Sequence, residues 1–180
     1  FVNSNKLVVF FQSAKKNNLK VIKNKKNWIT FVGKLNKAKG YDVFAKVILK
    51  ILKKFPNWNA KIIGDEKREK IALNHKNADI LGFLNHDKVL KIFEKTSIAV
   101  ACSRWEEPFG RTSLEASANG CAVIITNKGG LPETVTNAKI MKTLNAKSLE
   151  KNIVQLIKDN NLRTKLQKLS IENFYLTHKF

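Results

Sequence analysis

Short apolar runs alternate with amphipathic segments along most of the chain. Most of these runs hold four to six residues, many of them β-branched, which is typical of strands buried on both faces. We expect strands at residues 29–33, 60–64, 79–83, 97–101, 121–126 and near 140–141. Between these runs, apolar residues at three- and four-residue spacing predict amphipathic helices. We expect helices at residues 41–55, 65–74, 86–95, 112–119, 146–158 and 162–174.

Strands that alternate with helices of this length predict an α/β fold, a Rossmann-like doubly wound parallel sheet with helices on both faces. Ligands of such folds bind beside the carboxyl ends of the strands. The loops to inspect are therefore residues 33–40, 64–67, 82–85, 102–111 and 127–133. The start of the chain differs, and there we expect a short strand at 7–12, then a helix, then a linker around 23–27.

The charge of the chain is strongly positive, with 34 basic and 14 acidic residues and a formal net charge of +20. Such a charge is typical of proteins that bind nucleic acid or anionic membranes. Thirty of the basic residues are lysines and only four are arginines, the residue preferred for bidentate phosphate and base contacts. Lysine, asparagine and isoleucine are abundant together, as A/T-rich coding would produce. We therefore expect most lysines to be solvated surface residues, and nucleic-acid binding remains the alternative.

The composition excludes several classes of protein. With 43% hydrophobic residues, the chain is not intrinsically disordered. No stretch approaches the ~18 consecutive apolar residues that a membrane span requires. Two cysteines, Cys102 and Cys121, are too few for a disulfide framework, and no His/Cys spacing is typical of a zinc site. His86 and the other two histidines are isolated, so surface or capping roles are expected. Because the chain begins with Phe1 rather than Met, we expect it to be part of a longer protein.

Two carboxylates stand eight residues apart in the segment Glu-Pro-Phe-Gly-Arg-Thr-Ser-Leu-Glu at 107–115. Glu107 falls in a strand-to-helix loop, and Glu115 falls one turn inside the following helix. Gly110 lets backbone approach a ligand, and the N–H groups at a helix start form an anion site. A carboxylate beside an anion site suits a ligand with hydroxyl groups and phosphate, as a sugar nucleotide has. Helix capping by the carboxylates is an equally good alternative on spacing alone.

Two further loops carry weaker signals. Gly33 ends the first core strand, and Lys34 and Lys39 follow it before a helix, where lysines can neutralise a diphosphate. In a chain with 30 lysines, two solvated surface residues are the favoured alternative. The pair Gly129-Gly130 permits either a close approach to a ligand or an ordinary turn. Neither the dinucleotide-binding fingerprint nor a P-loop occurs in the sequence.

In this order, the motifs resemble the C-terminal, donor-binding domain of the family 4 retaining glycosyltransferases, the group 1 domain of the GT-B fold. The family patterns are a strand followed by G-R-L and K-G, then E-P-F-G-x-x-x-x-E, A-x-x-x-G-x-x-V-I-x-T and G-G-x-P-E. They correspond here to residues 31–40, 107–115, 116–126 and 129–133. Lys34 stands where the family usually has arginine.

The resemblance implies a division of the chain. Residues 28–180 would be the nucleotide-sugar-binding, Rossmann-like domain. Residues 1–27 would be the tail of the N-terminal domain with the interdomain linker, where 3–5 form a turn and 19–22 the last strand of that domain.

The resemblance also implies roles for individual residues. Lys34 and Lys39, after Gly33, would hold the diphosphate of the donor and stabilise the leaving group. Glu107 would accept hydrogen bonds from the donor sugar, and Glu115 would bind the ribose hydroxyls.

Other parts of the donor would meet backbone groups and a loop. The N–H groups of Phe109, Gly110 and Arg111 would face the sugar and phosphate, and the loop with Phe83 and Leu84 would contact the base. No metal ion or other cofactor is expected, because lysines and helix dipoles supply the positive charge.

The function implied is transfer of a sugar from a nucleotide-diphosphate sugar to a glycan or lipid-linked acceptor, in cell-surface polysaccharide or lipopolysaccharide biosynthesis. The protein would be cytoplasmic, with contact to the anionic inner face of the membrane as a further expectation. The alternatives are a basic nucleic-acid-binding domain and a non-catalytic, glycosyltransferase-like partner. If the protein is a glycosyltransferase, no specific nucleic acid is expected to bind it.

Overall fold

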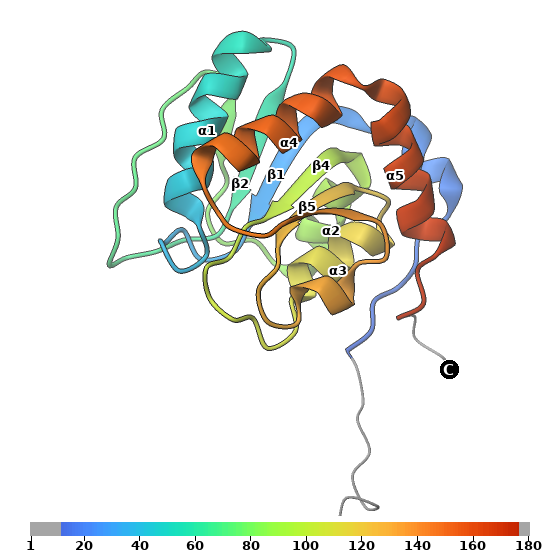
Figure 1. Ribbon diagram of the computed structural model, residues 1–180. Helices are drawn as coiled ribbons and strands as arrows, with labels where there is room; N and C mark the ends of the chain where they lie inside the picture. Colours follow the sequence, from blue (N-terminus) through green and yellow to red (C-terminus); the bar gives the residue numbers. More distant parts are fainter. Residues whose placement is uncertain (1–11, 177–180) are drawn as a thin grey trace, which may run out of the picture.

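Six parallel strands form one sheet in the computed structural model, which describes residues 12–176 (Figure 1). The strands are β1 (Lys26–Val32), β2 (Asn59–Ile63), β3 (Ala78–Ile80), β4 (Thr96–Ala101), β5 (Ala122–Thr126) and β6 (Ala138–Met141). Their order across the sheet is β3-β2-β1-β4-β5-β6. The order runs outward in both directions from the β1–β4 pair, which confirms the expected doubly wound parallel sheet.

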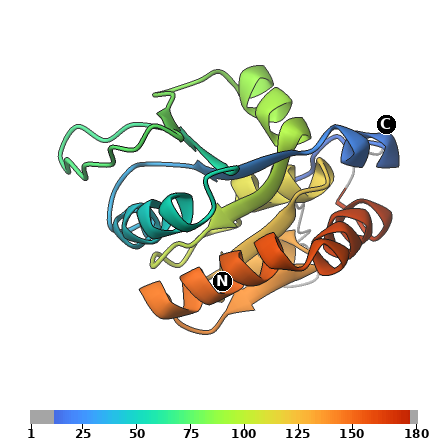
Figure 2. The ribbon, with the colours of Figure 1, turned by 90° about the horizontal axis from the view of Figure 1, so that it is seen from above.

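Helices cover both faces of this sheet (Figure 2). They are α1 (Tyr41–Lys54), α2 (His86–Lys95), α3 (Arg111–Ala118), α4 (Ala146–Lys158) and α5 (Asn160–Glu172). Two short 3-10 helices, η2 (Leu19–Asn24) and η3 (Leu131–Thr134), also lie in the described part of the chain. None of the helices within residues 12–176 is both long and apolar enough to cross a membrane.

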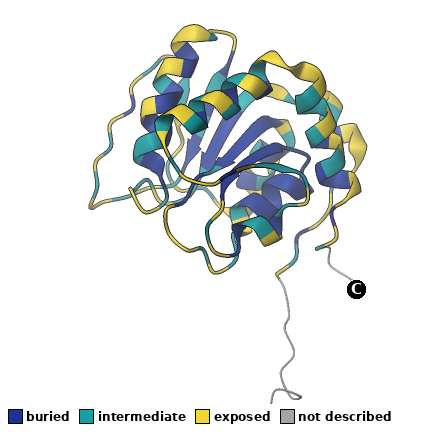
Figure 3. Ribbon diagram, in the orientation of Figure 1, coloured by how far each residue is buried: buried dark blue, intermediate teal, exposed yellow. Residues whose placement is uncertain are grey.

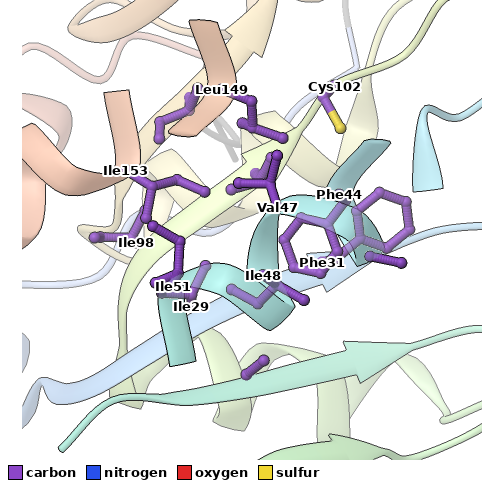
Figure 4. Packing of buried hydrophobic residues seen from close by; sticks show 14 of the residues in the cluster. Ile29, Phe31, Phe44, Val47, Ile48, Ile51, Ile98, Cys102, Leu149 and Ile153 are labelled. Atoms are coloured by element: carbon purple, nitrogen blue, oxygen red, sulfur yellow. The ribbon is translucent and has the colours of Figure 1, made fainter. Parts of the chain in front are cut away.

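Alternate residues of each central strand supply two separate apolar layers. On one face, Ile29 and Phe31 of β1 and Ile98 of β4 pack against α1 and α4. Figure 4 shows this layer, in which side chains of the two helices meet above the strands. On the other face, residues such as Ala99 and Val123 pack against α2 and α3. Because β4 and β5 are buried on both faces, they read as unbroken apolar runs in the sequence (Figure 3).

The helix expected at residues 65–74 is wrong, because the structure has an irregular connection there. Its first six residues are all charged, so a helix would present no apolar stripe to the sheet. The carboxylates instead hold the loop after β1. Glu66 accepts a hydrogen bond from the Asn36 side chain at 3.0 Å, and Glu69 accepts one from the backbone N–H of Lys37 at 3.0 Å. Among residues 65–74, only Leu73 is buried, and it belongs to the apolar layer that α1 covers.

The segment before β1 also departs from expectation. Residues 19–22, expected as a strand of a preceding domain, begin the 3-10 helix η2, and β1 starts inside the expected linker at Lys26. The expected turn at 3–5 lies outside the described residues, as does nearly all of the expected strand at 7–12. Lys25, between η2 and β1, places its ammonium against the carbonyl oxygens of Phe93 at 2.8 Å and Asn119 at 2.6 Å. This contact joins the segment to the ends of α2 and α3.

Candidate functional site

A cavity of about 210 Å³ lies at the carboxyl ends of β1 and β4, the two strands at which the sheet order reverses. Open α/β sheets bind ligands at this place, because the connections leaving the two strands diverge to opposite faces. Its walls come from four segments of the chain: the end of β1, the loop before α1, the loop between β4 and α3, and η3. The walls include the predicted residues Gly33, Lys39, Glu107, Gly110 and Arg111.

Lys39 and Glu107 form an ion pair in the wall of this cavity. The lysine Nζ lies 2.6 Å from Oε1 and 2.8 Å from Oε2 of the carboxylate. Glu107 exposes only 12% of its side chain, whereas Lys39 exposes 33%. Asn36 orders the loop by accepting a hydrogen bond from the backbone N–H of Lys39 at 3.0 Å. The cavity thus holds a cation that an anionic ligand can attract and a carboxylate that can accept hydroxyl protons.

The start of α3 forms another wall. Gly110 caps the helix with a φ of 104°, a left-handed conformation that favours glycine. Arg111 and Thr112, the first two residues of the helix, line the cavity. The positive end of the α3 dipole therefore faces the same space as Lys39. The structure brings these motifs together although they lie about 70 residues apart in the sequence.

Glu115 does not line this cavity, although the family resemblance implies that it binds the ribose of the donor. It is buried on α3, and its Oε1 accepts hydrogen bonds from Arg111 Nε at 2.7 Å and from His86 Nε2 at 2.9 Å. The Arg111 contact spans one helical turn. The His86 contact comes from α2, and nothing in the sequence connects these two residues.

A second cavity of about 260 Å³ adjoins the first and shares Val32 and Gly33 with it. Lys34, Phe83 and Leu84 line it, and Phe83 is 80% exposed. The structure therefore separates the two predicted lysines, since Lys39 lines the first cavity and Lys34 the second. The predicted roles of Lys34, Phe83 and Leu84 stay predictions.

The loop with Gly129 and Gly130 packs against the loop between β4 and α3, called here the acidic loop because it carries Glu106 and Glu107. Gly130 donates its N–H to the carbonyl of Glu107 at 2.7 Å, and Gly129 donates to the Glu106 carboxylate at 2.6 Å. Lys128 also binds Glu106 at 2.6 Å, and this hydrogen bond is the main cause that lowers the pKa of the Glu106 carboxyl. From their sequence, the glycines are compatible either with a close approach to a ligand or with an ordinary turn. In the structure they approach the segment that carries Glu107.

Cys102 lines the first cavity but is unsuited to nucleophilic chemistry. Its side chain is completely buried, and this burial raises the pKa of the thiol to about 12. The thiolate, which is the reactive form, is therefore disfavoured. Within residues 12–176, no group of three or more His, Cys, Asp or Glu side chains is placed to hold a metal ion.

Comparison with known proteins places these features in a wider context. Residues 12–172 match the model of the family described as "Glycosyl transferases group 1". The spore coat protein SA of Bacillus subtilis is 28% identical over 162 residues, 81% of this chain and 43% of that protein. The lipopolysaccharide core biosynthesis mannosyltransferase LpsB of Rhizobium meliloti is 30% identical over 121 residues, 62% of this chain and 34% of that protein. The chain spans less than half the length of these relatives.

Solved structures show the same fold. The crystal structure of the C-terminal domain of a glycosyl transferase group 1 family protein from Francisella tularensis superposes with a TM-score of 0.72 at 24% identity. The match covers 90% of this chain and 92% of that domain. An Anabaena protein in complex with UDP-glucose superposes with a TM-score of 0.68 at 18% identity, over 89% of this chain and 50% of that one. The fold is therefore that of known GT-B domains.

Proposed function

The chain belongs to the glycosyl transferases group 1 family, and from this premise we propose that it is the donor-binding domain of a retaining glycosyltransferase. The whole enzyme transfers a sugar from a nucleotide-diphosphate sugar to a glycan or lipid-linked acceptor in cell-surface polysaccharide biosynthesis. A preceding domain supplies the acceptor site. The observation that carries the proposal is the meeting of Lys39, Glu107 and the start of α3 around one cavity.

The proposal assigns the donor diphosphate to Lys39 and the positive end of α3. Both are sources of positive charge in the walls of the same cavity, and charge develops on the diphosphate as the sugar departs. A diphosphate that binds there competes with Glu107 for the lysine ammonium. The carboxylate then becomes available to accept hydrogen bonds from the sugar hydroxyls. These groups supply the charge stabilisation, so the mechanism requires no metal ion.

The second cavity accommodates the nucleoside end of the donor in this proposal. The exposed Phe83 ring offers a face on which a base can stack, and Leu84 adds apolar wall. Lys34 lines the same cavity and adds a second positive charge that the phosphates can meet. Glu115 binds the ribose hydroxyls. That Anabaena structures hold UDP-glucose or UDP on the same fold supports this class of ligand.

A titration of the 180-residue chain with UDP, GDP and ADP tests the proposal. Calorimetry or NMR should detect binding of at least one of them in the absence of divalent cations. Lys39→Ala should weaken this binding by roughly tenfold or more, since a charge-assisted hydrogen bond is lost. Lys128→Ala is the matched control, because Lys128 forms an equally short ion pair with Glu106 but does not line either cavity. The proposal fails if no nucleotide binds or if both variants bind as the unmodified chain does.

The same chain distinguishes the alternatives. Tight binding to mixed-sequence DNA or RNA with a steep salt dependence would favour the nucleic-acid reading. Activity of the full-length protein that disappears in Glu107→Ala would exclude a non-catalytic partner.

The outer face of α1 and α4 supports a second contact, with an anionic membrane. The exposed lysines on this face are Lys46, Lys50, Lys53, Lys54, Lys147, Lys151 and Lys158. The two helices carry two acidic residues, Glu150, which pairs with Lys50 at 3.9 Å, and Asp42, which pairs with Arg104 at 2.6 Å. Such a face is attracted to anionic lipid by long-range electrostatics, each lysine contributing about 1 kcal/mol near the surface.

Vesicle co-sedimentation tests this contact. Binding should rise with the fraction of anionic lipid and fall when the four α1 lysines are replaced by glutamine. Replacing Lys88, Lys91 and Lys95 of α2 is the control on the opposite face. Sedimentation that ignores the anionic fraction would refute the membrane contact and leave the donor site unaffected.

A further inference from the structure

The carboxylate of Glu115 is held by donors from two different helices. It exposes only 9% of its side chain, and both hydrogen bonds go to the same oxygen, Oε1. Among the hydrogen bonds between described residues, none reaches Oε2. Within the described residues, Oε2 is also not one of the buried side-chain atoms that lack a partner, so it reaches solvent and is available to a ligand.

The two donors differ in what they connect. Arg111 lies one turn from Glu115 on the same helix, and its side chain is 64% exposed. His86 is the first residue of α2, and this helix follows directly on the loop with Phe83 and Leu84. Asn85 caps α2 by accepting a hydrogen bond from the N–H of Lys88 at 3.1 Å, which orders the backbone at His86. His86 therefore connects Glu115 to the start of the helix that follows the loop with Phe83 and Leu84.

The direction of the His86 hydrogen bond follows from chemistry. An ionised carboxylate only accepts, so Nε2 of the imidazole must donate. The bond fixes the rotation of the carboxylate about its last side-chain torsion, because Arg111 and His86 approach Oε1 from different helices. With Oε1 occupied, Oε2 is presented in a fixed direction.

We propose that His86 is a positioning residue for nucleotide recognition: it holds the Glu115 carboxylate so that Oε2 accepts hydrogen bonds from the ribose hydroxyls. The inference rests on the proposed donor site. It assigns a specific function to a histidine that belongs to no recognisable motif in the sequence. It also makes the fit of the base beside Phe83 and the recognition of the ribose interdependent, since both involve the start of α2.

The test compares a nucleoside diphosphate with its 2′,3′-dideoxy form. The probe is whichever of UDP, GDP and ADP binds the 180-residue chain most tightly. The unmodified chain should prefer the ribose form, and His86→Ala should reduce this preference by roughly fivefold, because one charge-assisted hydrogen bond to a half-exposed donor is lost. Affinity for the dideoxy form should change little.

Two conservative variants separate positioning from mere packing. His86→Gln keeps an N–H donor at the position of Nε2 and should restore the preference. His86→Asn places its amide nearer the backbone and should not restore it. An NMR signal of the His86 ring nitrogens in the unmodified chain should shift with the ribose form more than with the dideoxy form. This measurement does not depend on the folding of any variant.

The outcomes are distinguishable. If the unmodified chain binds no nucleotide, the proposed function itself fails. If it binds nucleotide but shows the same preference after His86→Ala, the role of His86 is refuted while the donor site stands. The role of His86 would also be refuted if His86→Ala lost affinity equally for the ribose and dideoxy forms, or if the imidazole signal responded equally to both. Either result would indicate that His86 only links α2 and α3 structurally.

Discussion

Gly129 lies where the loop after β5 meets the acidic loop after β4, and its replacement by alanine tests whether this contact shapes the candidate site. Its φ of 51° is in the left-handed region. A Cβ atom there would lie 2.2 Å from the carbonyl oxygen and 2.5 Å from the nitrogen of Glu107. Both are backbone atoms that cannot rotate away, so the two loops must separate.

The magnitude of this effect has two parts. The left-handed conformation costs an alanine about 1 kcal/mol. Separation of the loops also breaks the bond from Gly130 to the carbonyl of Glu107, at about 1 kcal/mol. We therefore expect Gly129→Ala to lower the free energy of unfolding by about 2 kcal/mol, following these estimates.

Gly82 provides the matched control. Its φ of 64° is similar, and a Cβ atom there would meet no other atom within 4 Å. Gly82→Ala should therefore cost only the conformational part, about 1 kcal/mol. Urea unfolding of both variants measures the difference, and a nucleotide titration should show weaker binding only in Gly129→Ala. Equal costs for the two substitutions would show that the close contact with Glu107 does not stabilise this loop.

Three further predictions concern charged and titratable groups. Glu107→Gln should tighten the binding of a free nucleoside diphosphate by roughly fivefold in calorimetry, because the carboxylate that competes for Lys39 is removed. The Lys39–Glu107 ion pair is partly exposed and is worth about 1 kcal/mol. Unchanged or weaker affinity would contradict this prediction. Burial raises the pKa of the Cys102 thiol from 9.0 to about 12. At a pH between these values, the thiol ionises in the unfolded chain but stays protonated in the folded one. Its contribution to stability therefore falls as pH rises. The stability difference between the unmodified chain and Cys102→Ala in urea unfolding should therefore shrink by about 2 kcal/mol from pH 8 to pH 10.5, and a constant difference would contradict the prediction. Lys25→Met should destabilise the chain by about 2 kcal/mol in urea unfolding, because two backbone carbonyls lose their buried donor, and an unchanged midpoint would show that they are satisfied without it.

Local patterns predicted most of the architecture. All six core strands expected between residues 29 and 141 are present. The signal is strongest for β4 and β5, which are buried on both faces and are therefore mostly apolar. The helix α1 shows the same logic, with buried residues at helical spacing and lysines between them. The expected helix at 65–74 fails for the corresponding reason: six charged residues in succession cannot form a buried stripe, and tertiary hydrogen bonds decide their conformation instead.

The candidate site was predictable as a set of loops but not as a geometry. The motif at 107–115 and the glycine pair at 129–130 stand out because their residue types serve special backbone or charge requirements. Whether the glycines face a ligand or another loop depends on what the fold places opposite them. Here that neighbour is the backbone of Glu107, which no local pattern reveals.

Sequence periodicity alone predicted the strands, most helices and the ends of the strands beside which ligands of this fold bind, because burial and backbone geometry act over a few neighbouring residues. Only the tertiary structure decided which polar side chains meet. The order of the strands brings Lys39 to Glu107 across 68 residues and His86 to Glu115 across 29, and it directs Lys34 and Lys39 into different cavities. Such pairs form because the sheet places distant loops side by side, and a contact of this kind leaves no periodic trace in the chain.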